Sequence, residues 1–170
     1  MKQEAKELVQ MSYDQLKPGE ELPVVELVVD DDLQGRYVLA VQDESPWYYK
    51  DSPWGGPITH PSTLAGSTIL AARARYDYPF GWVHARQETE FINPLPLGKR
   101  VKVISKIIEK YRKRDKGYIV VESLLVDQDG IEIMRLRQHG MIDDERIREA
   151  AKTGLKHRPP PASERFQKKS

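Results

Sequence analysis

The chain has 170 residues, which is enough for one domain with its own hydrophobic core and short for two. Its 27 lysines and arginines nearly balance its 26 aspartates and glutamates, and the formal net charge of +1 disfavours a dedicated DNA-binding protein. The absence of cysteine excludes a disulfide framework, an iron–sulfur cluster and a cysteine nucleophile, and it is consistent with a reducing, cytoplasmic compartment.

The first segment, residues 2–12, predicts a short amphipathic helix, because its apolar side chains fall on one side among lysines and glutamates. The tripeptide Lys17-Pro18-Gly19 then predicts a turn. The start of the chain lacks the apolar region of a signal peptide, and no stretch approaches the ~20 apolar residues of a membrane span. We therefore expect a cytoplasmic protein without a membrane span.

A strand and a short helix are predicted next. Residues 23–29 form a valine-rich run that favours a strand. The aspartates at 30–32 are suited to cap the amino end of a helix that runs to Tyr37.

Residues 43–61 predict an ordered loop. They hold four prolines and two adjacent glycines, which disfavour any regular element. The loop also holds two tryptophans and two tyrosines, which need burial, so we expect it to pack against another part of the chain. This loop is the first candidate for a functional site.

A helix is predicted from Pro61 to about Arg75, because proline is favoured in a first turn and the apolar residues that follow have helical spacing. Strands are predicted at 83–91, 101–110, 118–126 and 131–142, with residues 127–130 as the only tight turn. Four consecutive strands imply an antiparallel meander. Together these elements predict the α+β class, with one helix packed against one sheet.

The end of the chain, residues 145–170, predicts a basic, partly disordered tail after a single domain spanning 1–144. The tail holds eight lysines and arginines, three glutamates and three adjacent prolines, too few apolar residues to extend the core by more than a helical turn or two. It could contact an anionic partner, although a solvated tail is the favoured interpretation.

Three stretches resemble the MaoC-like acyl dehydratases and (R)-specific enoyl-CoA hydratases. Residues 41–48, VQDESPWY, resemble the Asp-x-Asn-Pro-x-His hydratase signature. Residues 54–61, WGGPITHP, resemble the segment that leads into the central helix of that family, and residues 83–98 resemble the strand and turn that follow it. The resemblance covers residues 19–142 and implies a hot-dog fold, in which a curled antiparallel sheet wraps around a long central helix.

The resemblance implies an acyl-thioester hydratase or dehydratase that adds or removes water across the α,β double bond, with acyl-CoA as the expected thioester. Asp43 stands at the acidic position of the signature, Tyr48 replaces its histidine, and His60 is the nearest histidine that could act as the base. An imidazole transfers protons near neutral pH, whereas tyrosine is a poor base there. His60 could instead simply cap the helix that follows.

Further residues are implied to bind the substrate. Pro61 has no N–H, so Ser62 or Thr63 would donate to the thioester carbonyl at the start of the helix. His84 could line the thioester tunnel, although a structural role in its strand is favoured. The complete set of predicted substrate-binding residues is Ser45, Trp47, Trp54, Gly55, Gly56, Ser62, Thr63 and His84.

No metal site and no separate cofactor are expected, with coenzyme A entering only as part of the substrate. The histidines at 60, 84 and 139 lack the spacing of a zinc site, and no phosphate-binding or dinucleotide-binding glycine motif is present. The basic stretch 110–116 could meet coenzyme A phosphates or an acyl carrier protein, although a solvated hairpin tip is the favoured interpretation.

The resemblance also implies partners. The expected ligand is an acyl-CoA or acyl-carrier-protein thioester, and the expected assembly is a homodimer or a heterodimer with another hot-dog subunit. A non-catalytic subunit that pairs with an active hydratase is the first alternative, favoured by the missing signature histidine. A hot-dog thioesterase is the weaker alternative. The aromatic residues at 47, 48, 49 and 54 indicate a bulky or ring-bearing acyl group.

Overall fold

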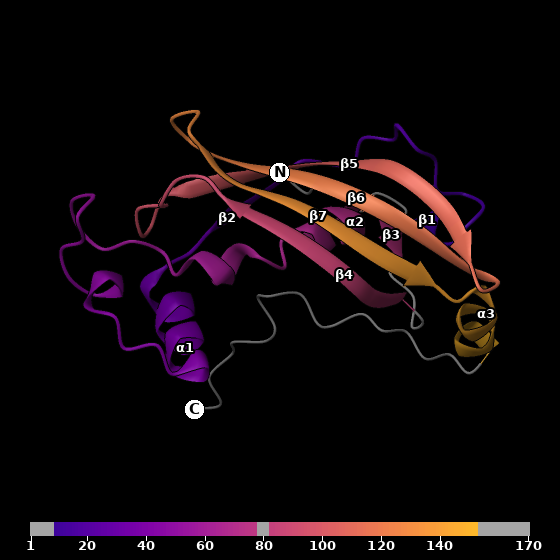
Figure 1. Ribbon diagram of the computed structural model, residues 1–170, viewed down its shortest axis with the longest axis horizontal. Coiled ribbons are helices and arrows are strands. Elements are labelled where there is room, and N and C mark those ends of the chain that lie inside the picture. Colours follow the sequence, from indigo (N-terminus) through magenta and orange to yellow (C-terminus); the bar gives the residue numbers. More distant parts are fainter. Residues whose placement is uncertain (1–8, 78–81, 153–170) are drawn as a thin grey trace, which may run out of the picture.

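A curled, five-stranded antiparallel sheet forms most of the protein (Figure 1). The computed structural model describes residues 9–77 and 82–152. The strand order is β2-β5-β6-β7-β4. The strands are β2 (Val25–Val28), β4 (Trp82–Phe91), β5 (Arg100–Lys113), β6 (Lys116–Asp127) and β7 (Glu132–Ile142).

Alternation of side chains defines the inner face of the sheet. Buried and exposed residues alternate over the first half of β5, as period-2 geometry requires, so that Val101, Val103 and Ile107 lie in the core. The register shifts within three strand pairs, including the one between Ile107 and Glu109 of β5, and such irregularities increase local bending. The sheet therefore curls around its inner face.

The helices occupy different places on this sheet. Helix α2 (Thr68–Arg75) lies against the inner face, where Ala71 and Ala72 are buried with Ile107 and Ile119 of the strands. The small side chains of Ala71 and Ala72 allow this close approach. Helices α1 (Asp31–Val41) and α3 (Asp144–Lys152) lie at opposite ends of the sheet (Figure 1).

The predicted class, α+β with one helix against one sheet, is confirmed. The strand at 23–29 and the four later strands are all present, although β5 and β6 extend further than expected. Helix α1 is capped by Asp30, whose Oδ1 accepts from the N–H of Leu33 at 2.8 Å, and it continues four residues beyond Tyr37.

The predicted meander is wrong for one strand. Only β5, β6 and β7 are successive neighbours, whereas β4 pairs with β7 on the far side of the sheet. The connection after β4 crosses the end of the sheet, where the N–H of Gly98 donates to the carbonyl of Val29. The β5–β6 turn is also tight, because Arg114 and Asp115 both have positive φ, the geometry that a two-residue hairpin loop prefers.

The predicted helix over 61–75 is divided in two. A short 3-10 helix, η2 (Pro61–Leu64), precedes α2, and the hydroxyl of Ser67 donates to the carbonyl of Leu64 at 2.6 Å between them. Such a side-chain bond competes with the regular helical ladder.

The elements predicted at the two ends of the chain lie only partly within the described residues. Residues 9 and 10 form strand β1 (Val9–Gln10), which pairs in parallel with β3 (Tyr76–Asp77), so the helix predicted over 2–12 is wrong there, because pairing with a distant segment overrides local propensity. Residues 1–8 lie outside the described part of the chain. The expected tail begins as α3, whose Ile147 is buried, and its remainder, 153–170, is also outside the described residues.

Candidate functional site

The site begins at the carboxyl end of α1. Gln42 takes the left-handed conformation, with φ of 56°, and the N–H of Asp43 donates back to the carbonyl of Val38 at 3.2 Å. Asp43 is therefore fixed directly to the end of the helix. Its Oδ1 accepts from the N–H of Ser45 at 3.0 Å, and Pro46 then starts the short helix η1 (Pro46–Tyr48).

Three side chains that are separated in sequence meet at one carboxylate oxygen. The hydroxyl of Tyr48 donates to Oδ2 of Asp43 at 3.2 Å, and Nε2 of His60 lies 3.3 Å from the same oxygen. The ring centroids of Tyr48 and His60 are 4.9 Å apart. The structure thus brings together the three residues that the sequence predicts as catalytic.

The exposure of these side chains differs. The side chain of His60 is 12% exposed and that of Asp43 is 39% exposed, while Tyr48 is buried. Asp43 is therefore the member of the group that solvent reaches most readily. A carboxylate with one open side and fixed donors on the other can accept a proton from water.

The hydrogen bonds of His60 indicate which ring nitrogen carries the proton. Nδ1 accepts from the backbone N–H of Ser62 at 3.2 Å, so in the neutral ring the proton belongs on Nε2, which faces Asp43. The same bond makes His60 the N-cap of η2. The capping interpretation of His60 is therefore confirmed, and it coexists with the contact to Asp43.

Tyr48 is a donor in this arrangement. Burial, the nearby charge of Asp43 and the hydrogen bond to it together raise the pKa of Tyr48. The phenol therefore keeps its proton near neutral pH and orients the carboxylate. A tyrosine that acts as a base would instead need a lowered pKa.

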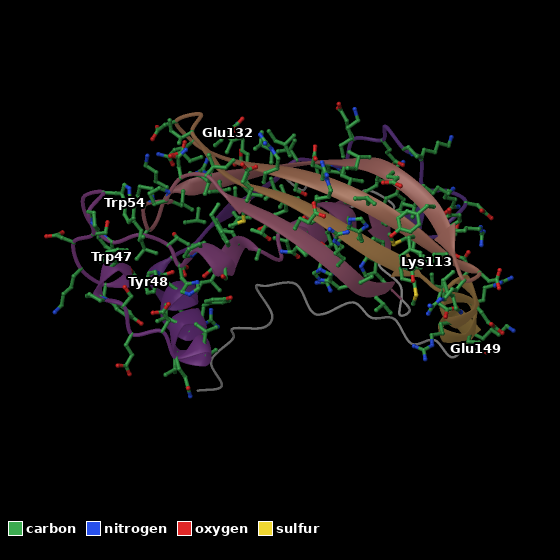
Figure 2. All side chains as sticks on the ribbon, viewed as in Figure 1. Trp47, Tyr48, Trp54, Lys113, Glu132 and Glu149 are labelled. Carbon is green, nitrogen blue, oxygen red and sulfur yellow. The ribbon has the colours of Figure 1, made fainter. Side chains whose placement is uncertain are left out.

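An apolar cavity of about 290 Å³ lies beside this group of three residues, of which Tyr48 lines it and Asp43 and His60 do not. Tyr48 connects the two, because its ring lines the cavity and its hydroxyl binds Asp43. The rings of Trp47 and Trp54 meet edge to face at 5.5 Å, and both lie with Tyr48 at one end of the molecule (Figure 2). The other residues that line the cavity are Ile58, Thr59, Pro61, Leu64, Phe91, Ile92, Asn93, Pro94, Leu95, Ile133 and Met134.

The remaining predicted binding residues do not line this cavity. Gly55 and Gly56 form a turn with φ of +80° and +77°, in which the N–H of Ser52 donates to the carbonyl of Gly56. Ser45 holds Asp43 through its backbone. His84 is exposed near the opposite end of β4 from Phe91.

The predicted carbonyl donors are already engaged within the chain. The N–H of Ser62 donates to His60 Nδ1, and the N–H of Thr63 donates to the carbonyl of His60 at 3.0 Å. The basic β5–β6 hairpin lies far from the site, since Lys113 and Trp54 are at opposite ends of the sheet in Figure 2.

Two residues of α1 were missed by the sequence analysis. Gln34 is buried and its side chain bonds to the backbone of Ile58 and His60, and the Tyr37 ring lies 5.0 Å from the His60 ring. The available signal was helical spacing, because Gln34 lies four residues before the buried Val38 and so shares its face.

Within residues 9–77 and 82–152, no group of three or more histidine or acidic side chains could hold a metal ion. Over the same residues, no helix is both long and apolar enough to cross a membrane.

Comparison with solved structures identifies the class of fold. The chain matches the R-hydratase PhaJ1 from Pseudomonas aeruginosa with a TM-score of 0.67 and 17% identity, covering 79% of this chain and 87% of that one. It matches a MaoC-like dehydratase from Rhodospirillum rubrum with a TM-score of 0.63 and 16% identity, covering 76% and 94%. It matches the 3R-hydroxyacyl-ACP dehydratase complex HadBC from Mycobacterium tuberculosis with a TM-score of 0.61 and 17% identity, covering 78% and 99%.

The protein therefore has the hot-dog fold that the resemblance implies. Within that class, the solved structures that it resembles include MaoC-like dehydratases and (R)-hydratases. No protein-family model and no curated protein matches the sequence.

Proposed function

We propose that the protein is an acyl-thioester hydratase or dehydratase. One observation carries the proposal: Tyr48 and His60 converge on Oδ2 of Asp43 beside an apolar cavity. A hydratase needs a placed proton carrier next to a site for an acyl chain, and this arrangement supplies both. The similarity in fold to hydratases and dehydratases supports the same reaction class.

In the hydration direction, the carboxylate of Asp43 accepts a proton from water while the water oxygen bonds to Cβ of the enoyl thioester. The proton then passes from the carboxyl group to Cα, and the double bond becomes a single bond. Dehydration reverses these steps. Tyr48 donates to the carboxylate throughout, Nε2 of His60 lies against the same oxygen, and together they hold the carboxylate in one orientation.

The acyl chain occupies the cavity in this proposal. Its walls are almost entirely apolar, and its volume of about 290 Å³ exceeds the ~150 Å³ that suffices for benzene in an engineered cavity. A medium-length or ring-bearing acyl group therefore fits better than a two- or four-carbon group. This agrees with the preference that the aromatic loop predicts.

The thioester carrier is coenzyme A or an acyl carrier protein, and the partner subunit is a second hot-dog domain. Two of the similar structures are complexes of unlike chains, HadBC and ChsH1-ChsH2. In this protein β4 is an edge strand that pairs only with β7 among the described strands, and it leaves Val83 and Phe91 exposed. Light scattering of the purified chain distinguishes a homodimer from a monomer that awaits another subunit.

The alternative is a non-catalytic subunit. It is favoured by the N–H groups of Ser62 and Thr63, which donate within the chain instead of toward a thioester carbonyl. Such a subunit would bind the acyl chain beside an active hydratase and perform no chemistry itself.

Hydration of a series of enoyl-CoA esters by the purified protein tests the proposal. Asp43→Asn should lower kcat/KM by about 10²–10⁴-fold, the usual contribution of a general acid or base. Asp51→Asn is the matched control, because Asp51 is an exposed aspartate of the same loop that lies outside the cavity wall. Acyl-CoA binding without turnover would favour the non-catalytic subunit, and neither binding nor turnover would contradict both.

A further inference from the structure

Gln34 is a buried amide that binds two backbone groups of a distant segment. It is 1% exposed on α1. Its Nε2 donates to the carbonyl of Ile58 at 2.8 Å, and its Oε1 accepts from the N–H of His60 at 3.0 Å. These two bonds pair both the nitrogen and the oxygen of the amide and fix the position of the side chain.

The two bonds flank a single residue, Thr59. The amide of Gln34 therefore pairs with the segment 58–60 much as a neighbouring strand would. On its other side this segment is held by the loop after β4, where the N–H of Thr59 donates to the carbonyl of Leu95 at 2.7 Å. The segment 58–60 is thus held from both sides.

The same helix fixes Asp43. The chain passes directly from Val41 through Gln42 to Asp43, whose N–H bonds to the carbonyl of Val38. Helix α1 therefore positions the carboxylate through chain continuity and the imidazole through Gln34. One rigid element controls the distance between the two.

We propose that Gln34 is a positioning residue that sets the imidazole of His60 against the carboxylate of Asp43. Nε2 of His60 lies 3.3 Å from Oδ2 of Asp43, within the distance of an ion pair. A shift of the segment 58–60 would change this distance. The catalytic consequence rests on the proposed function, whereas the geometric claim does not.

Gln34→Leu is the principal test, because leucine is of similar size and forms neither bond. The ¹⁵N signals of the histidine rings report the position and tautomer of His60 without any substrate, and His84 and His139 serve as internal references. We expect the His60 signals to move and those of the references to stay. In the hydration assay we expect kcat to fall about 10–100-fold with KM within about threefold, since displacement of a catalytic group by ~1 Å lowers rates by about 10²-fold.

Gln138→Leu is the matched control. Gln138 of β7 is also 1% exposed, but neither of its side-chain polar atoms has a hydrogen-bond partner among the described residues. This variant tests whether the loss of any buried amide, without the two bonds that Gln34 makes, changes the His60 signals or the activity. We expect the His60 signals and the hydration activity of this variant to match those of the wild type.

Gln34→Glu decides the question if the leucine variant fails to fold. A protonated carboxyl group can donate to the carbonyl of Ile58 and accept from the N–H of His60, whereas an ionised one can only accept. The His60 signals should therefore match the wild type at low pH and depart from it once the introduced carboxyl ionises.

Unchanged His60 signals in folded Gln34→Leu, or in Gln34→Glu at every pH, would overturn the positioning role. A wild-type protein that hydrates no substrate would overturn the proposed function alone, because the ring signals require no turnover.

Discussion

The Tyr48→Phe variant removes one oxygen atom from the group of side chains that meets at Asp43. Tyr48 is buried and its hydroxyl donates to Oδ2 at 3.2 Å, so the ring keeps its place in the cavity wall while the carboxylate loses a donor. Two other contacts remain, from the N–H of Ser45 and from Nε2 of His60. The variant therefore isolates the contribution of the hydroxyl group.

The expected magnitude follows from the geometry. A hydrogen bond to a charged group contributes about 1.5–3 kcal/mol, and the partial exposure of Asp43 reduces this to about 1 kcal/mol. In a domain of this size, 1 kcal/mol lowers Tm by about 2–4 °C. If the same energy is lost in the transition state, kcat/KM falls about fivefold to tenfold.

The pH dependence of stability gives an independent check. Burial and the charge and hydrogen bond of Asp43 raise the pKa of Tyr48, so its contribution is complete below the unfolded value of ~10 and is lost as the pH rises through the higher folded value. The stability difference between wild type and Tyr48→Phe should be constant from pH 7 to 9 and shrink above ~10. Urea unfolding across this range measures it.

The hydration assay separates a donor from a proton carrier. If Tyr48→Phe loses activity as completely as Asp43→Asn, by ~10³-fold or more, then the phenol itself transfers a proton and the assignment of Tyr48 as an orienting donor is wrong. If Tyr48→Phe matches the wild type in both stability and activity, the hydrogen bond to Asp43 is absent in solution.

Three further predictions concern the cavity and the sheet. Trp47→Ala should lower kcat/KM for aromatic and medium-chain enoyl-CoA esters by about 10-fold or more, because these larger acyl groups reach the cavity wall that Trp47 forms. Hydration of a four-carbon ester should be nearly unaffected. Equal losses for all esters would place the acyl chain elsewhere. Burial acts to raise the pKa of Asp127, but hydrogen bonds from the N–H groups of Ile131 and Asp129 and from Lys99 outweigh it and lower the pKa. Asp127→Asn should therefore destabilise the protein by about 2 kcal/mol at pH 7 and by progressively less as the pH falls below ~4 and through the lowered pKa of the carboxyl group. Urea unfolding across this pH range measures the loss of stability, and a loss that does not change with pH would contradict the prediction. Gly140→Ala should destabilise the sheet by about 1–3 kcal/mol, because the new Cβ would lie 2.0 Å from Cζ2 of Trp82; thermal unfolding tests this, and an unchanged Tm would mean that the ring can move aside freely.

Local sequence determined most of the secondary structure. The valine-rich run, the aspartates at 30–32 and the alternating strands act over a few residues, and the corresponding elements β2, α1 and β4–β7 are all present. The Asp-Gly hairpin also formed where it was predicted, with Gly130 at φ of +84°. Helix start signals and period-2 alternation need no distant partner, which is why they can be read from one chain.

Pairing across the sheet was decided by tertiary structure. Nothing local indicates that β4 leaves its neighbour in sequence and pairs with β7, or that residues 9 and 10 pair with β3. Strand pairing depends on which buried faces meet when the sheet curls around α2, and that is a property of the whole domain.

The site shows the same division. The loop 43–61 and the residues Asp43, Tyr48 and His60 were predicted from the sequence, through aromatic content and a signature with two substitutions, serine for asparagine and tyrosine for histidine. Tertiary packing of α1 against the loop decides the rest. It brings Tyr48 and His60 to one oxygen of Asp43, and it places Gln34 where its side chain bonds to the backbone of His60. In the sequence, a glutamine on a helix face cannot be distinguished from any other polar residue. Its amide acquires a specific role only from the groups that fold against it.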